Sequence, residues 1–201
     1  KLFIFYIYMT FKKLGEGSFG CVIKPSLKCH KTTKKNMVSK LLKNTKNYKH
    51  ELKISKRLQN SKKLKLKPCK HFCTILDKCY LKHRDIPKEL RYDDLMFNHK
   101  TLKKKCFNTR IDPTIAIERN KKFVSLLMPN CGKGLTEETL KFLKNKPNFF
   151  NFIKHSLKSL EYTKHKKIVL GDIKLDNMLI KYKNPILIDF GSAQIISSQK
   201  K

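Results

Sequence analysis

The sequence predicts an α+β fold made of a small antiparallel sheet followed by a mainly helical part. Three observations lead to this prediction. Short apolar runs surround a glycine cluster near the start, helical patterns occupy residues 136–166, and two further short apolar runs follow them. The chain has 201 residues, 40% hydrophobic content and thirteen Phe, which is enough for one large domain or two small lobes.

The first predicted elements are three strands. Residues 10–25 (TFKKLGEGSFGCVIKP) alternate around glycines, which predicts two strands joined by a glycine-rich turn. Residues 37–42 (MVSKLL) are apolar and partly β-branched, so they predict a third strand with Val38, Lys40 and Leu42 on one face. Lys40 would then point in a defined direction.

The spacing of apolar residues over 48–58 predicts a helix that carries Glu51. Residues 60–110 are rich in lysine and show little periodicity, so we interpret them as an insertion. The run at 2–9 (LFIFYIYM) is less than half of the roughly 20 residues that a membrane helix needs. It predicts a strand, or it precedes a true start at Met9.

The second half of the sequence predicts one more strand, two helices and a hairpin. Residues 123–128 (FVSLLM) form a buried strand, which the Pro and Gly residues of 129–134 end as a linker. Thr136 begins a short helix, because its hydroxyl can cap free amides. A longer amphipathic helix from Pro147 to about Lys166 is indicated by four apolar residues: Phe149, Ile153, Leu157 and Leu160.

A hairpin follows this second helix. Residues 178–180 and 185–188 are short apolar runs separated by the polar residues 181–184, a pattern typical of two strands and a turn.

The charge is strongly positive, with 47 Lys and Arg against 15 Asp and Glu and a net charge of +32. Such a charge suggests an acidic partner such as nucleic acid, phosphorylated protein or an anionic membrane surface. Only five of the basic residues are Arg, whereas phosphate and base recognition usually recruit Arg for its bidentate fork. We therefore interpret most lysines as solvated surface residues and expect nonspecific polyanion binding at low salt.

Seven cysteines without regular pairing, and no cleavable signal, predict free thiols in a reducing intracellular compartment. Five thiol and imidazole residues lie close together in the sequence: Cys69, His71, Cys73, Cys79 and His83. Zinc is one interpretation of this cluster. Structural or unliganded cysteines are favoured, because the spacings lack the paired C-x2-C of common zinc modules.

Gly15, Gly17 and Gly20 with Val22 form the pattern G-x-G-x-x-G-x-V. Glycines let backbone amides approach phosphate oxygens without obstruction by side chains. Alone the pattern is weak, because similar triplets occur in ordinary turns and in dinucleotide-binding folds. A dinucleotide motif should lead into a helix, whereas these glycines lead into a strand.

Acidic and amide side chains gather in a second motif. Residues 170–177 read LGDIKLDN, and Asp189-Phe190-Gly191 follows the predicted hairpin. The motif places Asp172, Asn177 and Asp189 around one loop and one hairpin end, a set of oxygen ligands that suits magnesium and a substrate hydroxyl.

With these motifs in order over residues 11–191, the chain resembles the eukaryotic-type serine/threonine protein kinases. The resemblance implies a two-lobed fold with ATP between the lobes. The smaller lobe would span 10–128 with the insertion, the hinge 129–134, and the larger, truncated lobe 135–201. It also implies that ATP and Mg²⁺ are the cofactors.

The resemblance assigns a role to each motif residue. Six residues would cover the phosphates: Gly15, Glu16, Gly17, Ser18, Phe19 and Gly20. Lys40 would pair with the phosphates and Glu51 would hold Lys40. Five residues would surround or bind adenine: Val22, Val38, Met128, Asn130 and Leu179, with Leu127 at the back of the pocket.

The same resemblance makes Asp172, Lys174 and Asn177 the catalytic residues and Asn177 and Asp189 the metal ligands. Asp172 would orient or deprotonate the substrate hydroxyl. Lys174, two residues later, would contact the transferred phosphate, a feature of the serine/threonine branch.

The chain also departs from the family pattern. Val38 and Ser39 stand where Ala and Ile are usual, and Leu170 and Gly171 stand in place of the His and Arg before Asp172. Without that Arg, we do not expect switching by a phosphorylated activation loop. Ten residues follow Gly191, which suggests either a fragment or a pared-down kinase.

We therefore expect a monomeric enzyme that transfers the γ-phosphate of ATP to a protein hydroxyl, without a membrane span. Two alternatives are a non-catalytic nucleotide-binding scaffold and a kinase of small molecules, because Leu170-Gly171-Asp172 resembles the H-G-D loop of antibiotic kinases. Lys174 and the Asp-Phe-Gly triplet argue against the latter. The lysine-rich, compact character resembles kinases of large DNA viruses, which would place the protein in the host cytoplasm or the virion.

Overall fold

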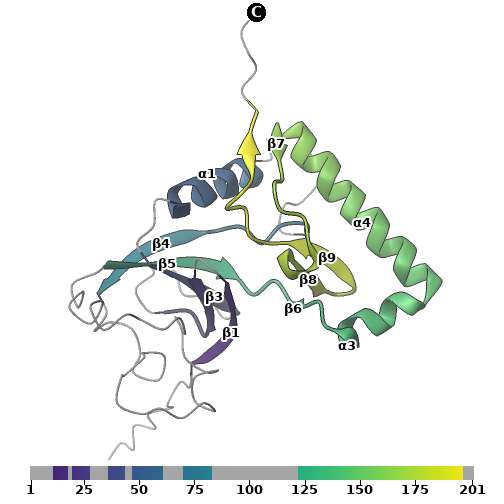
Figure 1. Cartoon of the computed structure of the whole chain (residues 1–201), viewed down its shortest axis with the longest axis horizontal. Coiled ribbons are helices and arrows are strands. Elements are labelled where there is room, and N and C mark those ends of the chain that lie inside the picture. The colour runs from purple at the N-terminus through teal and green to yellow at the C-terminus, as the bar shows by residue number, and fades with distance from the viewer. Residues whose placement is uncertain are drawn as a thin grey trace, which may run out of the picture. The chain divides into compact units, whose positions relative to one another are not determined.

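The computed structural model describes residues 11–17, 20–27, 36–43, 47–60, 70–82 and 122–196, with its elements labelled in Figure 1. Packing divides the chain into two compact units. The first comprises 1–45 and 77–128, and the second comprises 46–76 and 129–201. The predicted run 2–9 lies outside the described residues.

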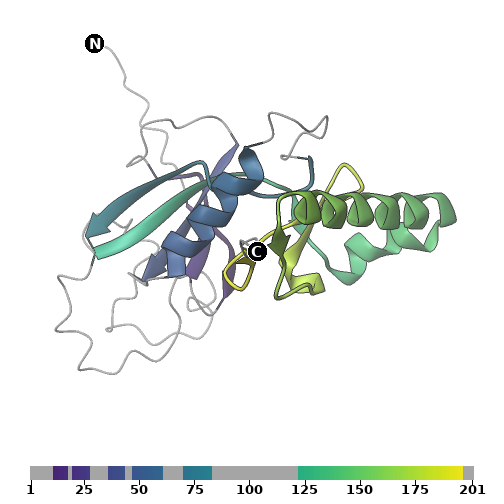
Figure 2. The ribbon, with the colours of Figure 1, turned by 90° about the horizontal axis from the view of Figure 1, so that it is seen from above.

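The first unit is a five-stranded sheet of order β1-β2-β3-β5-β4. Its strands are β1 (Lys12–Gly17), β2 (Gly20–Lys24), β3 (Met37–Lys43), β4 (Asp77–Lys82) and β5 (Lys122–Pro129). Strands β1 and β2 are antiparallel, as are β2 and β3 and the β4–β5 pair, whose strands run side by side in Figure 2. The four strands predicted before residue 130 are confirmed.

The core of the first unit lies on one side of these strands. Its buried members are Cys21, Ile23, Leu27, Leu41 and Leu81. They alternate with half-buried or exposed neighbours along β2 and β4, as strand geometry requires. The unusual Ser39 is fully buried beside this core, where its hydroxyl accepts a 2.9 Å hydrogen bond from the amide of Leu27.

Strand β4 corrects the interpretation of residues 60–110 as irregular insertion, because residues 77–82 are part of the sheet. The missed signal is a period of two: Cys79 is half-buried and Leu81 buried, whereas Lys78 and Tyr80 are exposed. This alternation is short and lies between lysines, so the strand was not recognised in the sequence. Residues 61–69 and 83–110 lie outside the described part of the chain.

The second unit combines helices with short strands. Its helices are α1 (Asn47–Gln59), α3 (Glu137–Leu140), the 3-10 turn η5 (Lys141–Lys144), α4 (Lys146–His165) and the 3-10 turn η6 (Leu175–Asn177). Its strands are β6 (Lys133–Gly134), β7 (Ile168–Val169), β8 (Met178–Lys181), β9 (Asn184–Leu187) and β10 (Gln194–Ile195). The predicted helices and the 178–188 hairpin are confirmed.

One hydrophobic cluster holds the second unit together. It contains Ile54 and Leu58 of α1, Phe72, Tyr162 of α4, Ile168, Leu187 of β9, Phe190 and Ala193. Helix α4 packs against β9, as Figure 1 shows. The buried Tyr162 hydroxyl donates a 2.7 Å hydrogen bond to the carbonyl of Leu58, which links α4 to α1.

Helix α1 groups with the second unit, although the sequence analysis assigned it to the smaller lobe. The physical reason is its buried face: Ile54 and Leu58 are fully buried in the cluster of the second unit. The predicted lobes follow the family resemblance, whereas the two units follow packing, so their boundaries can differ. The predicted domain boundaries stay a prediction.

The burial of α4 differs from the prediction. Its regular apolar stripe is exposed, with exposed fractions from 39% to 60% for Phe149, Ile153, Leu157 and Leu160. The helix instead buries Phe152, Ser159, Tyr162 and Thr163. The periodicity identified the helix correctly but selected the wrong face.

The cysteines also correct the sequence analysis. Cys73 and Cys131 form a disulfide with a Cα–Cα distance of 5.8 Å, and Cys21 and Cys79 are disulfide-bonded too. The expectation of free thiols is therefore wrong for these four residues. The residues that the structure describes contain no group of three or more metal-ligating side chains, and Cys69 and His83 lie outside them.

None of the helices in the described ranges is both long enough and apolar enough to span a membrane.

A pair of histidines packs between α4 and the segment before β4. The rings of His71 and His155 stack with centroids 5.8 Å apart, and Nδ1 of His71 lies 3.2 Å from the hydroxyl of Ser159. The Nδ1 atom of His155 is buried with no hydrogen-bond partner among the described residues. Burial is the main cause that lowers the pKa of each ring. The charges of His155, Lys158 and Lys70 lower the pKa of His71 further. Those of Lys158, Lys154 and Lys70 lower the pKa of His155 further.

This pair predicts a pH-dependent stability. An unfolded histidine binds a proton near its ordinary pKa of 6.5, whereas the folded pKa of each ring is lower. Stability is therefore fully present above pH 6.5 and falls as the pH drops through 6.5 toward the folded pKa. We expect the melting temperature to fall between pH 7 and pH 5, and to fall less in His155→Gln.

The matched control is His165→Gln, at the exposed end of the same helix. This variant should keep the pH dependence of the parent protein. An unchanged pH dependence in His155→Gln would show that the stacked pair of histidines does not set this pH dependence.

Candidate active site

The glycine motif forms a tight antiparallel pair in the first unit. Gly17 lies opposite Gly20, and Gly15 lies opposite Val22. An added Cβ at Gly15 would meet no atom within 4 Å, so the backbone there borders open space. Ser18 and Phe19 lie outside the described residues.

Lys40 lies beside Val22 across the strand pair. The two residues are direct partners of β3 and β2, so their side chains emerge on the same face of the sheet. Strand geometry places Val38 and Leu42 on that face too. Leu127 and Met128 lie near the end of β5 in the same sheet, where Leu127 is buried and Met128 half-buried.

The catalytic-loop residues lie in the second unit, after α4 ends. Lys167 has a positive φ of 53°, which turns the chain into β7, and β7 pairs with β10. The loop then runs through Asp172 to the 3-10 turn η6. This anchoring by β7 on one side and by η6 on the other positions the loop.

Three predicted catalytic residues contact one another in this loop. The ammonium of Lys174 lies 2.9 Å from Oδ2 of Asp172. The side-chain amide of Asn177 donates to the same oxygen and to the backbone carbonyl of Asp172, both at 3.0 Å. Asp172 is thus oriented from two sides.

The hairpin β8–β9 brings Asp189 to the same loop. Its turn uses Tyr182 and Lys183 with φ of 51° and 63°, the two successive left-handed residues of a type I′ turn. The strands return the chain so that the amide of Ile188 donates to the carbonyl of Asn177 at 2.9 Å. Asp189 follows with a φ of 61° and accepts a 3.2 Å hydrogen bond from the amide of Gly191.

A pocket within the second unit collects these groups. Its lining includes Asp172, Asn177 and Asp189, together with Leu170, Gly171, Ile173, Leu187, Ile188, Phe190, Ser192 and Ala193. The donor set fits a hard cation, since carboxylate and amide oxygens are the ligands that Mg²⁺ takes. The amide nitrogen of Asn177 is turned to Asp172, so its oxygen is the atom that could bind a metal.

Electrostatics keep Asp172 ionised. The hydrogen bond from Lys174 lowers the pKa of Asp172, the bond from Asn177 lowers this pKa further, and the contact with Asp172 raises the pKa of Lys174. At neutral pH the loop therefore holds a carboxylate beside an ammonium. A carboxylate with a lowered pKa is a weak base, so this arrangement favours orientation of a hydroxyl over early proton removal.

Replacing Lys174 should raise the pKa of Asp172. In Lys174→Gln the charged hydrogen bond disappears, so the carboxyl should titrate at higher pH than in the parent protein. Carbon-13 NMR of labelled aspartate measures this change directly. Lys164→Gln, an exposed lysine of α4, is the control and should leave the titration of Asp172 unchanged. If the pKa of Asp172 were the same in Lys174→Gln as in the parent protein, the contact with Lys174 would not influence this pKa in solution.

Packing accounts for Gly171, which replaces the usual arginine. A Cβ added at this position would lie 2.5 Å from the carbonyl oxygen of Ser192 and 3.1 Å from its Cβ. Such contacts are too close for any side chain unless Ser192 moves. In this chain Ser192 occupies the space that a side chain at position 171 would need.

The linker holds a contact that the sequence analysis missed. The ammonium of Lys181, on β8, donates a 2.9 Å hydrogen bond to the backbone carbonyl of Asn130. The hairpin was predicted with Lys181 in its turn, whereas in the structure Lys181 is the last residue of β8. The partner in the linker could not be inferred, since the pairing of β6 with β8 joins residues far apart in the sequence.

Some of the predicted site residues come together within the second unit, and others belong to the first unit. Asp172, Lys174, Asn177 and Asp189 come together in the second unit. That unit also contains the buried Glu51 on α1, Asn130, and Leu179 opposite Ile186 in the hairpin. The glycine motif, Val22, Val38, Lys40, Leu127 and Met128 belong to the first unit.

Comparison with known protein families gives a match to the model of the protein kinase domain, which covers residues 8–201. No curated protein gives a significant match to this sequence.

Proposed function

The chain belongs to the protein kinase family, and from this premise we propose that it is a serine/threonine kinase that transfers the γ-phosphate of ATP to a protein hydroxyl. The family makes the protein a phosphotransferase of the kinase type, with ATP and Mg²⁺ as the usual cofactors of such domains. Beyond the family, we propose that this chain is catalytically active and that it phosphorylates the hydroxyl of serine or threonine. Support for this proposal comes from the loop around Asp172.

The observation that carries the proposal is the contact set of Asp172. The carboxylate is exposed and ionised, and Lys174 and Asn177 orient it at 2.9 and 3.0 Å. An oriented carboxylate can accept a hydrogen bond from an incoming hydroxyl and align its oxygen for attack. In this proposal the ammonium of Lys174 offsets negative charge on the group being transferred.

Asn177 and Asp189 are the residues that would hold magnesium. When bound, the metal would supply neutralisation of phosphate charge. Asn177 has a second part in the proposal, because its amide also fixes Asp172. One side chain then connects the metal site with the residue that orients the hydroxyl.

Lys174 supports the choice of serine and threonine over tyrosine. The family pattern places a lysine at this position in the serine/threonine branch, and here its ammonium is held beside Asp172 by a hydrogen bond. The net charge of +32 further suggests that acidic or already phosphorylated peptides are the better substrates.

The test uses purified protein with Mg²⁺ and radiolabelled ATP. Acidic and basic peptides, each with Ser, Thr or Tyr as the sole acceptor, are offered separately. We expect labelling of Ser and Thr peptides, more in the acidic set, and loss of labelling with EDTA. Labelling of Tyr alone, or nucleotide binding without any transfer, would refute the proposal. Transfer to small metabolites instead of peptides would favour a small-molecule kinase.

A further inference from the structure

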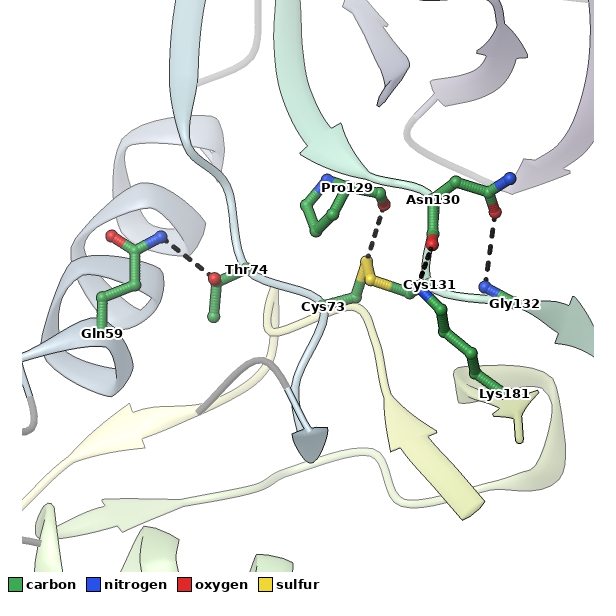
Figure 3. The surroundings of a disulfide bond; sticks show 8 residues. All are labelled: Gln59, Cys73, Thr74, Pro129, Asn130, Cys131, Gly132 and Lys181. Carbon is green, nitrogen blue, oxygen red and sulfur yellow. Dashed lines mark hydrogen bonds between the residues drawn. A yellow bond between two sulfur atoms is a disulfide. The ribbon is translucent and has the colours of Figure 1, made fainter. Parts of the chain in front are cut away.

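The linker 129–134, which includes the end of β5 and the strand β6, makes contacts at four consecutive residues, from Pro129 to Gly132, as Figure 3 shows. Cys131 is bonded to Cys73, and the carbonyl of Asn130 accepts from Lys181. The amide of Gly132 donates to the side-chain oxygen of Asn130 at 3.3 Å, and the carbonyl of Pro129 lies 3.4 Å from Sγ of Cys73. One of these ties is covalent and joins residues 58 positions apart.

The other end of the disulfide is firmly placed. The amide of Cys73 donates to the carbonyl of Leu187 at 2.9 Å, which pairs its segment with β9. The next residue, Thr74, accepts a 3.0 Å hydrogen bond from the side chain of Gln59 on α1. The disulfide therefore attaches the linker to a segment that two elements already hold.

We propose that Cys73 and Cys131 form a redox-controlled tie that fixes the linker 129–134 when oxidised and releases it when reduced. The surroundings suit both forms. A disulfide sulfur has no proton, so the 3.4 Å contact with Pro129 is only van der Waals in the oxidised form. A reduced Cys73 can donate its thiol proton to that carbonyl, so the buried thiol also has a partner.

The chemistry is thiol–disulfide exchange with a glutathione-type couple. One cysteine thiolate attacks the disulfide of oxidised glutathione and displaces one glutathione thiolate. The second cysteine thiolate then attacks the mixed disulfide and displaces the other. Two protein thiols are oxidised, and one glutathione disulfide becomes two glutathione thiols. Cys73 and Cys131 are only 5% and 4% exposed, so exchange requires the linker to open and should take minutes to hours.

The consequence for nucleotide binding rests on the proposed function, which makes Asn130 a backbone partner of adenine. A binding segment that is already fixed loses less conformational entropy when the ligand arrives. The oxidised form should therefore bind nucleotide more tightly than the reduced form. The redox state of the two cysteines would then regulate occupancy of the kinase site.

The experiment equilibrates the full chain in glutathione buffers of increasing oxidised fraction and maps disulfides by mass spectrometry. Hydrogen exchange of peptides covering 129–134 and the melting temperature are measured at each point, as is affinity for Mg²⁺ with a non-hydrolysable ATP analogue. Oxidation should slow exchange in the linker and raise the melting temperature by about 8–16 °C, the range for a bond joining residues 58 apart. Affinity should rise about tenfold.

Two variants make the assignment specific. Cys73→Ser with Cys131→Ser keeps the other five cysteines, so the redox response of the linker should vanish while any response from those five remains. Lys181→Met removes a non-covalent tie from the same linker and leaves both cysteines in place. This variant should keep the response of linker exchange to oxidation, with faster exchange in both forms.

Each result decides the inference. Absence of a Cys73–Cys131 peptide under oxidising buffer, or equal linker exchange in the oxidised and reduced forms, would overturn it. Slower exchange with equal nucleotide affinity would overturn the regulatory part. If no nucleotide binds in either form, the proposed function fails, and the exchange measurement still decides whether the disulfide fixes the linker.

Discussion

Asp172→Asn should lower the rate of phosphate transfer by roughly 10²–10⁴-fold, the range for loss of a positioned acid–base group. Asparagine keeps the shape of the side chain but has one acceptor oxygen and no charge. The ammonium of Lys174, 2.9 Å from Oδ2, would lose its partner, and the incoming hydroxyl would lose its acceptor. Affinity for Mg²⁺ and an ATP analogue should change little, so the loss should appear in the turnover number.

The matched control is Asp176→Asn. Asp176 is an exposed acid in the turn η6 of the same loop. Among the described hydrogen bonds, the side chain of Asn177 binds Asp172 and not Asp176. This control should retain most of the parent rate. Equal rates for Asp172→Asn and the parent protein would contradict the role assigned to Asp172. An equal loss of rate in Asp172→Asn and Asp176→Asn would indicate general damage to the loop.

Phe72→Ala should destabilise the second unit by about 3–5 kcal/mol, the usual cost of removing a fully buried aromatic ring. Phe72 has no exposed surface, and its ring lies 5.4 Å from that of Tyr162 and 6.1 Å from that of Phe190. Its backbone is bridged to Leu187. The vacated space would border both α4 and the Asp-Phe-Gly triplet, so we expect a fall in melting temperature of about 10 °C.

Phe150→Ala is the control for this change. The side chain of Phe150 is 68% exposed on α4, so the same chemical truncation removes little buried surface. Its effect should stay within about 0.5 kcal/mol. Urea unfolding monitored by circular dichroism measures both variants. Similar losses in the two variants would mean that the cluster around Phe72 does not hold the unit together.

The motif residues were predictable because the residues of each motif lie close together in the sequence. Asp172, Lys174 and Asn177 lie within six consecutive positions, so one short loop can bring them together. The hairpin was predictable for the same reason, since the apolar runs before and after 181–184 can pair across a short turn. The pairing then places Asp189 near Asn177 without information from elsewhere in the chain.

The burial of α4 was not predictable from its own sequence. The regular stripe from Phe149 to Leu160 and the buried face of Phe152 and Tyr162 both repeat at helical spacing. Which face is buried depends on α1, β9 and the segment at Phe72, which are distant in sequence. The polar Ser159 belongs to the buried face because His71 lies against it.

By itself the sequence predicted the strands β1, β2, β3 and β5, the helices, the β8–β9 hairpin, the family and the motif around Asp172, but it missed β4. These features depend on local periodicity and on motifs a few residues long. Only the tertiary structure decided the state of the cysteines, the stacked histidines and the fit of Gly171 against Ser192. Each of these requires atoms far apart in the chain to come within a few ångströms, and packing of the whole unit determines such distances.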